Sequence, residues 1–102
     1  MVVYEVTLDV DEDLSRDVEE HMRQSHIPAI VATKCFRRIR FARSSARRFR
    51  TSYEAADQAD LDRYLRDYAP DLRTEFSEAF PRGVTLSRET WILQEVWDEV
   101  LS

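Results

Sequence analysis

The chain has 102 residues, a length typical of one domain, and we expect a single domain over residues 1–102. Apolar residues make up 43% and charged residues 34%, which excludes a disordered chain, and the longest apolar stretch, residues 27–32, is too short to span a membrane. The net charge of −5 argues against a general nucleic-acid-binding protein.

Residues 2–10 predict a half-buried strand, because apolar and polar side chains alternate along them. Its apolar face would consist of Val2, Tyr4, Val6, Leu8 and Val10. The acids at 11–13 favour a helix start, since carboxylates are stabilised at the positive end of a helix dipole. Apolar residues at helical spacing then predict a helix over residues 11–25, and Pro28 suits the start of a second, short helical turn.

The middle of the chain predicts a β-hairpin, with strands at 35–43 and 47–54 and a turn at 44–46. Residues 57–80 carry an apolar stripe at helical spacing, and Pro70 predicts a kink or break in that helix at Ala69. Residues 84–96 predict the last strand, while residues 97–101 are ambiguous. The order strand, helix, strand, strand, helix, strand predicts an α+β, ferredoxin-like βαββαβ sandwich, with a four-stranded antiparallel sheet and two helices on one face.

Charge is unevenly distributed, and this affects the open face of the predicted sheet. Residues 5–20 contain eight acids, whereas residues 34–50 contain eight bases and no acid. If each strand alternates, the open face carries Glu5, Thr7 and Asp9 from the first strand, Phe36, Arg38 and Arg40 from the second, and Arg48, Arg50, Ser52 and Glu54 from the third. Glu5 and Asp9 would then lie across from Arg48 and Arg50, and such cross-strand pairs are stabilising.

Two interpretations of this charged face remain open. It is either a lattice of ion pairs or a polar pocket, between the sheets of two copies, that binds a small anionic ligand through Arg38, Arg40 and Arg50. The candidate ligand-binding residues are therefore these three arginines with Glu5, Asp9 and His26. His26 ends the first predicted helix, where it would either cap carbonyl groups or act as an acid, a base or a ligand-binding group.

Metal and cofactor sites are not expected. His21 is predicted to lie on a helix face, and two histidines five residues apart do not match the spacing of four that places a metal-binding pair on one face of an α-helix. With Gly83 as its one glycine, the chain forms no phosphate-binding loop or dinucleotide fingerprint. Cys35, the only cysteine, excludes an internal disulfide and predicts an inert, partly buried thiol. The N-terminus has no basic region or cleavage site, so we expect a cytoplasmic protein without a signal peptide.

The last predicted strand has large apolar side chains on both faces, with Trp91 and Leu93 on one and Ile92 and Val96 on the other. A strand of this kind suggests that both faces of the sheet are covered. The helices cover one face, and a second copy is the simplest cover for the other. We therefore expect a homodimer in which two open sheet faces pack together.

Three segments resemble an uncharacterised bacterial family, domain-of-unknown-function family 4286. They are residues 2–11 (VVYEVTLDVD), residues 61–73 (LDRYLRDYAPDLR) and, as the most specific element, residues 26–33 (HIPAIVAT) followed by Phe36. The resemblance implies a ferredoxin-like fold close to the dimeric α+β barrel group and implies no known reaction. The resemblance also implies a glycine at or near position 34, where this chain has Lys34.

The sequence discloses no specific biochemical activity and leaves open whether the protein is an enzyme. We expect a non-catalytic homodimeric module that binds a ligand or a partner. One alternative is a cofactor-free enzyme acting on a small anionic molecule in the inter-sheet cleft, which rests on fold analogy alone. The other is RNA binding through the basic strand pair at residues 36–50, against which the missing RNA-binding signature and the net acidity argue.

Overall fold

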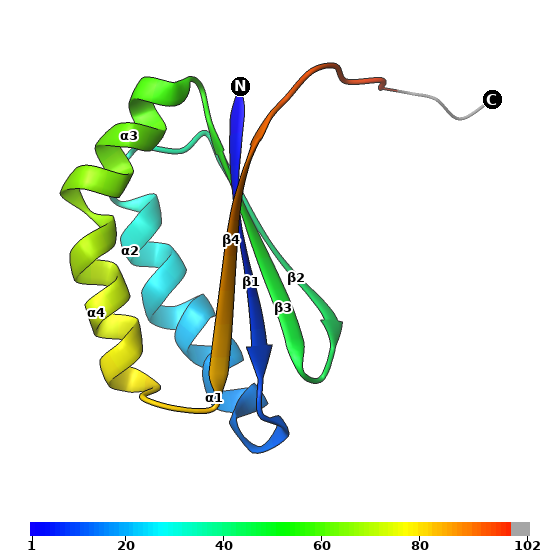
Figure 1. Ribbon diagram of the computed structural model, residues 1–102, viewed down its shortest axis with the longest axis vertical. Coiled ribbons are helices and arrows are strands. Elements are labelled where there is room, and N and C mark those ends of the chain that lie inside the picture. The colour runs from blue at the N-terminus through cyan, green and yellow to red at the C-terminus, as the bar shows by residue number, and fades with distance from the viewer. Residues whose placement is uncertain (99–102) are drawn as a thin grey trace.

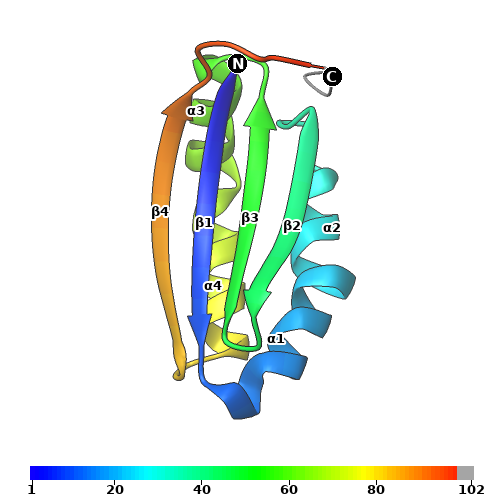
Figure 2. The same ribbon diagram turned by 90° about the vertical axis from the view of Figure 1, so that its right-hand side faces the viewer.

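The computed structural model describes residues 1–98 and contains one four-stranded antiparallel sheet with every helix on the same face (Figure 1). The strands are β1 (Val2–Val10), β2 (Arg38–Ser45), β3 (Arg48–Ala55) and β4 (Val84–Ile92), in the order β2-β3-β1-β4. Figure 2 shows the open face of the sheet toward the viewer, with the helices behind it. The predicted ferredoxin-like α+β fold is confirmed.

A single helical segment joins β1 to β2. It begins with the 3-10 turn η1 (Glu12–Leu14) and continues through α1 (Ser15–His21), the π-helical turn η2 (Met22–His26) and α2 (Ile27–Val31). The helix predicted over 11–25 therefore extends through Pro28, which lies in the first turn of α2 as expected. A regular α-helix would bring the proline ring against the carbonyl group four residues earlier, and the wider π-helical turn directly before it relieves that clash.

The second helical segment joins β3 to β4 and is broken near Pro70. It consists of α3 (Gln58–Asp67) and α4 (Ala69–Ala79), and Tyr68 between them leaves helical geometry with φ −124°. The break falls one residue before the predicted Ala69, which is the first residue of α4, with Pro70 beside it in the first turn. The Asp57 side chain caps α3 by accepting a hydrogen bond from the Asp60 N–H at 2.9 Å. Among residues 1–98, no helix combines the length and the apolar character of a membrane span.

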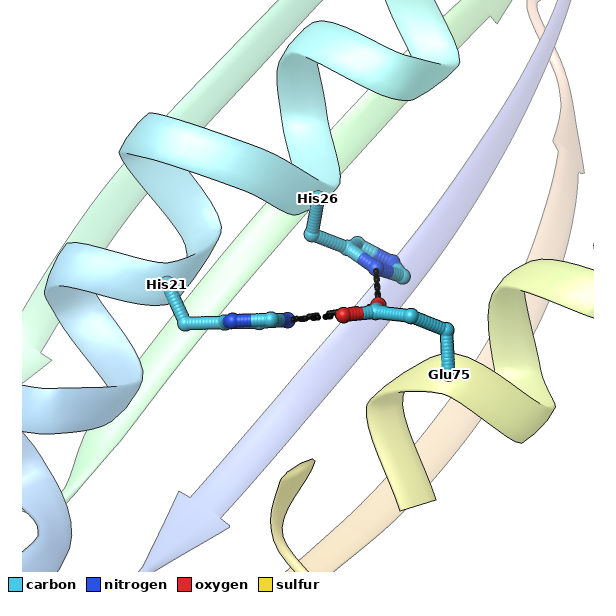
Figure 3. A group of neighbouring side chains, drawn as sticks. All are labelled: His21, His26 and Glu75. Carbon is cyan, nitrogen blue, oxygen red and sulfur yellow. Dashed lines mark hydrogen bonds and ion pairs between the residues drawn. The ribbon is translucent and has the colours of Figure 1, made fainter. Parts of the chain in front are cut away.

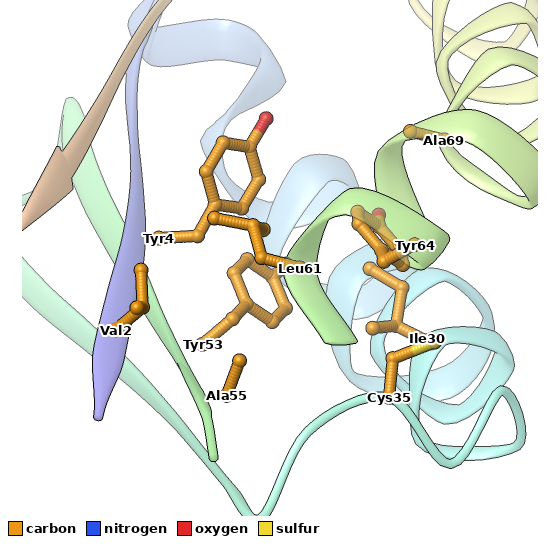
Figure 4. Packing of buried hydrophobic residues seen from close by; sticks show 9 residues of the cluster. All are labelled: Val2, Tyr4, Ile30, Cys35, Tyr53, Ala55, Leu61, Tyr64 and Ala69. Atoms are coloured by element: carbon orange, nitrogen blue, oxygen red, sulfur yellow. The ribbon is translucent and has the colours of Figure 1, made fainter. Parts of the chain in front are cut away.

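The core lies between the sheet and the helices in two adjoining clusters. One contains Val2, Tyr4, Ile30, Cys35, Tyr53, Ala55, Leu61, Tyr64 and Ala69 (Figure 4). The other contains Leu8, Val10, Val18, Met22, Phe49 and Phe76. The apolar face predicted for residues 2–10 is thus the buried face of β1, and the thiol of Cys35 is fully buried rather than partly buried.

The structure corrects the prediction for Phe36. Strand β2 begins at Arg38 rather than at residue 35, so the alternation that placed Phe36 on the open face does not apply to it. Its ring instead packs on the helix side, 4.9 Å from the ring of Tyr64 and 5.2 Å from that of Tyr53 between centroids. Two smaller differences are a hairpin turn that falls at residues 46–47, beside a bulge between Arg43 and Ser45, and a β4 that ends at Ile92 instead of residue 96.

Lys34 ends the first helical segment in the left-handed backbone conformation, with φ 62°. Its backbone N–H bonds to the Val31 carbonyl at 3.2 Å and closes the last turn of the segment, and its left-handed φ then directs the chain away from the helix axis toward Cys35. Glycine adopts it without strain, which agrees with the glycine that the family resemblance implies near this position.

We expect Lys34→Gly to raise the free energy of unfolding by about 0.5–1 kcal/mol. Relief of about 1–2 kcal/mol of left-handed strain should exceed the extra unfolded-chain entropy of about 0.4–1 kcal/mol. Urea unfolding followed by circular dichroism measures the change. Lys34→Ala is the matched control, since it removes the same side chain and keeps the strain. Equal stabilities of the two variants would contradict this account of the turn.

Candidate functional site

A cleft of about 90 Å³ lies between the helix-facing side of the sheet and two helical elements, η2 and α4. Its walls are mainly apolar and aromatic and come from β1, β3, β4, η2, α3 and α4. The lining residues are Tyr4, Val6, Leu8, Met22, His26, Tyr53, Tyr64, Leu72, Arg73, Phe76, Ser77, Leu86 and Arg88. Because β4 is an edge strand and its Leu86 is 38% exposed, the cleft opens to solvent beside β4.

Three tyrosines from three elements meet at one end of the cleft (Figure 4). The ring of Tyr4 lies 6.0 Å from that of Tyr53 and 6.2 Å from that of Tyr64, between centroids. Burial is the main cause that raises the pKa of both Tyr53 and Tyr64 far above the usual range of tyrosine. Both side chains therefore remain neutral phenols at physiological pH.

Cationic groups supply the polar side of the cleft. The Arg73 guanidinium, on α4, donates a hydrogen bond to the Tyr4 hydroxyl at 3.1 Å. Arg88 of β4 lines the same cleft, and it lies on the helix-facing side because it pairs with Val6 in the sheet register. An otherwise apolar cleft thus carries guanidinium and hydroxyl groups that can bind an oxygen-bearing ligand group.

His26 also lines the cleft and belongs to a cluster with His21 and Glu75 (Figure 3). Nε2 of His21 lies 3.0 Å from Oε1 of Glu75, while Nδ1 of His26 lies 3.7 Å from Oε2 of the same carboxylate. The edges of Phe76 and Phe80 pack against the His21 ring, and Phe76 packs against the His26 ring as well. Burial lowers the pKa of His26 and outweighs the nearby charge of Glu75, which acts in the opposite direction.

The π-helical turn explains why the two histidines meet. The sequence argument against a histidine pair at a spacing of five assumed an α-helix, in which residues three and four apart share a face. In η2 the Ile27 N–H bonds to the Met22 carbonyl, five residues earlier, so residues five apart come close to one another. The ring centroids of His21 and His26 are 6.3 Å apart, and neither histidine lies on a solvated helix face.

The other candidate residues lie on the opposite, open face of the sheet and form ion pairs. Arg48 binds Asp9 at 2.7 Å, and Arg50 lies 3.9 Å from Glu5. Arg38 and Arg40 lie 3.8 and 3.7 Å from the shared carboxylate of Glu54. The structure therefore brings the predicted acids and arginines together but places His26 on the other side of the sheet. Exposed pairs of this kind contribute little to stability, because water screens the charges.

Sequence reasoning did not select Arg73, Arg88 or Glu75 as site residues, and it treated Tyr4 only as part of the core. Each of the three charged residues comes from the second half of the chain and reaches the site only through tertiary packing. The one local signal was Tyr4, a hydroxyl-bearing side chain on an otherwise aliphatic strand face.

Comparison with known proteins agrees with this fold. The model of a family described as a domain of unknown function, DUF4286, matches residues 1–96. No curated protein matches the chain.

Three solved structures are similar in fold. HapK from Hahella chejuensis has a TM-score of 0.73 at 12% identity, covering 95% of this chain and 96% of that one. A dimeric ferredoxin-like protein from an uncultured marine organism has a TM-score of 0.71 at 6% identity, covering 95% and 98%. A proposed antibiotic biosynthesis monooxygenase from Deinococcus radiodurans has a TM-score of 0.71 at 15% identity, covering 96% and 97%. At these identities the likeness is one of fold.

Tyr53 and Tyr64 predict a loss of stability at alkaline pH. Burial raises the pKa of both in the folded state, whereas unfolded tyrosine ionises near pH 10, so unfolding releases protons above that pH. Their contribution to stability is therefore fully present below about pH 10 and falls above it, by about 1 kcal/mol for each of the two between pH 10 and pH 11. Urea unfolding at pH 8–11 measures the slope, which Tyr64→Phe should reduce.

Tyr68→Phe is the control for this measurement. Tyr68 is 36% exposed, so its hydroxyl is hydrated in both states and its loss should leave the slope unchanged. A slope that is the same in wild type, Tyr64→Phe and Tyr68→Phe would show that the buried phenols do not control alkaline unfolding.

Proposed function

We propose that this chain, which belongs to the DUF4286 family, is a homodimeric protein that binds a small molecule in the cleft between its sheet and α4. The observation that carries the proposal is the hydrogen bond from Arg73 to the Tyr4 hydroxyl inside a cleft whose other walls are largely apolar and aromatic. A polar anchor in an apolar cavity is the usual arrangement of a ligand-binding site. The similar structures support the fold only, so the proposal rests on this cleft and takes no activity from their names.

The cleft selects for a small ligand with an apolar body and one anionic or strongly polar oxygen group. The aromatic walls favour a ring or a short hydrocarbon chain, while Arg73 and Arg88 favour a carboxylate, a phenolate or an enolate. The volume of about 90 Å³ is smaller than the cavity of about 150 Å³ that binds benzene. Even a single-ring ligand would therefore extend past Leu86 into solvent.

An NMR titration with benzoate and salicylate tests the cleft. We expect amide shifts concentrated in β1, β4 and α4, and we expect Arg73→Gln to weaken binding by about tenfold or more, because a hydrogen bond to a charged group contributes about 1.5–3 kcal/mol. Arg66→Gln is the matched control, since Arg66 is exposed on α3 and its guanidinium pairs with Asp67. Shifts confined to the open face, or equal affinities in the two variants, would refute the cleft as the binding site.

The homodimer is supported by the apolar side chains that one copy leaves exposed. Trp91 pairs with Val3 in the register, so it lies on the open face of the sheet, where it is 49% exposed. Ile92 on the other face is 70% exposed, and the segment after β4 leaves the body of the molecule with Val96 and Trp97 also exposed (Figure 1). A second copy packed on the open face would cover Trp91, and one of the similar structures is described as a dimer.

Light scattering of the purified protein should report a dimer at about 10 µM, and Trp91→Glu should shift it to the monomer, because a buried, unpaired charge costs several kcal/mol. Arg16→Glu is the control, since it changes charge on the exposed side of α1, in the helical layer away from the open face. A monomeric wild type, or a dimer that tolerates Trp91→Glu, would argue against assembly through this face.

A further inference from the structure

The His21–His26–Glu75 cluster has the composition and the spacing of a metal-ion site. His21 is the last residue of α1, His26 is the last residue of η2, and Glu75 lies on α4. Their side chains converge, and one ligand atom from each lies within 4.8 Å of the others. Two ligand atoms on one tetrahedral zinc ion lie about 3.3 Å apart, given metal–ligand distances of about 2.0–2.2 Å. A single oxygen, Oε2 of Glu75, lies 3.3 Å from Nε2 of His21 and 3.7 Å from Nδ1 of His26, close to that value.

One atom of the cluster lacks a partner. Nδ1 of His26 is buried and has no hydrogen-bond partner among the described residues. Its nearest polar neighbour, Oε2 of Glu75, lies at 3.7 Å, beyond hydrogen-bond length. A buried polar group without a partner destabilises the folded state. A cation placed between the two atoms would bind both and remove that destabilisation.

The surroundings hold the three side chains in place. The Phe76 and Phe80 rings pack edge-on against the histidines, which restricts the rotation of both imidazoles. The histidines are mostly buried, with 18% and 14% of their side chains exposed, while Glu75 is 46% exposed and can admit an ion from solvent. The π-helical turn that brings the histidines together is a rare geometry often found at functional sites.

We propose that His21, His26 and Glu75 bind one divalent transition-metal ion of the zinc class per chain. Imidazole with a single carboxylate favours zinc and its first-row neighbours over magnesium or calcium, which prefer oxygen ligands. Three protein ligands leave a fourth position for water or a bound molecule. His26 also lines the cleft, so the bound ion would lie beside the cleft. The metal site is independent of the proposed cleft ligand, because it requires only these three side chains.

Titration of the full, tag-free and chelator-treated chain with zinc chloride tests the site. Calorimetry should give one zinc ion per chain with a Kd in the micromolar range or tighter, and magnesium chloride should give no heat. His21 and His26 are the only histidines of the chain, so both imidazole signals in the NMR spectrum should shift together. Zinc should also raise the Tm of the wild type. Cobalt(II) should give the visible absorption of a site of low coordination number.

Glu75→Gln and His21→Gln should weaken zinc binding by more than about 100-fold, since loss of even an outer-shell partner commonly costs 10–100-fold. Glu78→Gln is the matched control, because it makes the same change at an exposed position of the same helix. Circular dichroism verifies that each variant is folded. No binding at 100 µM zinc, histidine signals that do not shift, or equal affinities of Glu75→Gln and Glu78→Gln would each overturn the proposal and leave a histidine–glutamate ion pair in its place.

Discussion

The burial of one face of β1 is the constraint on which the rest of the structure depends. β1 lies between β3 and β4, and its neighbours pair with it residue by residue, so its alternation decides which side of the whole sheet is buried. Tyr4 and Leu8 face the helices, and the acids Glu5 and Asp9 face the open side. A register shift of one residue would place the acids in the core and Tyr4 in solvent, a costly exchange that specifies the pairing.

This constraint also separates two kinds of chemistry. On the open face, the acids of β1 meet the arginines of β3 in exposed ion pairs that are screened by water. On the helix side, the same strand contributes Tyr4 to a cleft where a hydroxyl and a guanidinium interact in less polar surroundings. The Tyr4 hydroxyl belongs to a buried side chain, so this hydrogen bond is less exposed to water than the ion pairs of the open face. The candidate ligand cleft therefore lies on the helix-facing side of the sheet, which carries fewer charged side chains than the open face.

The fold could be predicted because its signals are local. Alternation over residues 2–10 suffices for β1, and Pro70 indicates the break between α3 and α4, which falls at Tyr68, because proline fits the first turn of a new helix better than a helix interior. Phe36 was misplaced because strand alternation was extended to a segment that is not a strand. The histidine cluster was missed for two reasons. The argument assumed α-helical periodicity through a π-helical turn, and Glu75 lies 54 residues from His21 in sequence.

Strand β4 connects the two faces of the molecule. It is the edge strand next to β1, and it is exposed along most of its length, so the helices shield it less than they shield β1 or β3. Its alternation directs Leu86 and Arg88 toward the cleft and Trp91 toward the open face. Packing of a second copy on Trp91 would restrict the position of β4 and thereby the opening of the cleft beside Leu86. The proposed assembly and the proposed ligand would then act on the same strand from opposite sides. A ligand that binds better when β4 is held in place would also strengthen the dimer, because such coupling is reciprocal.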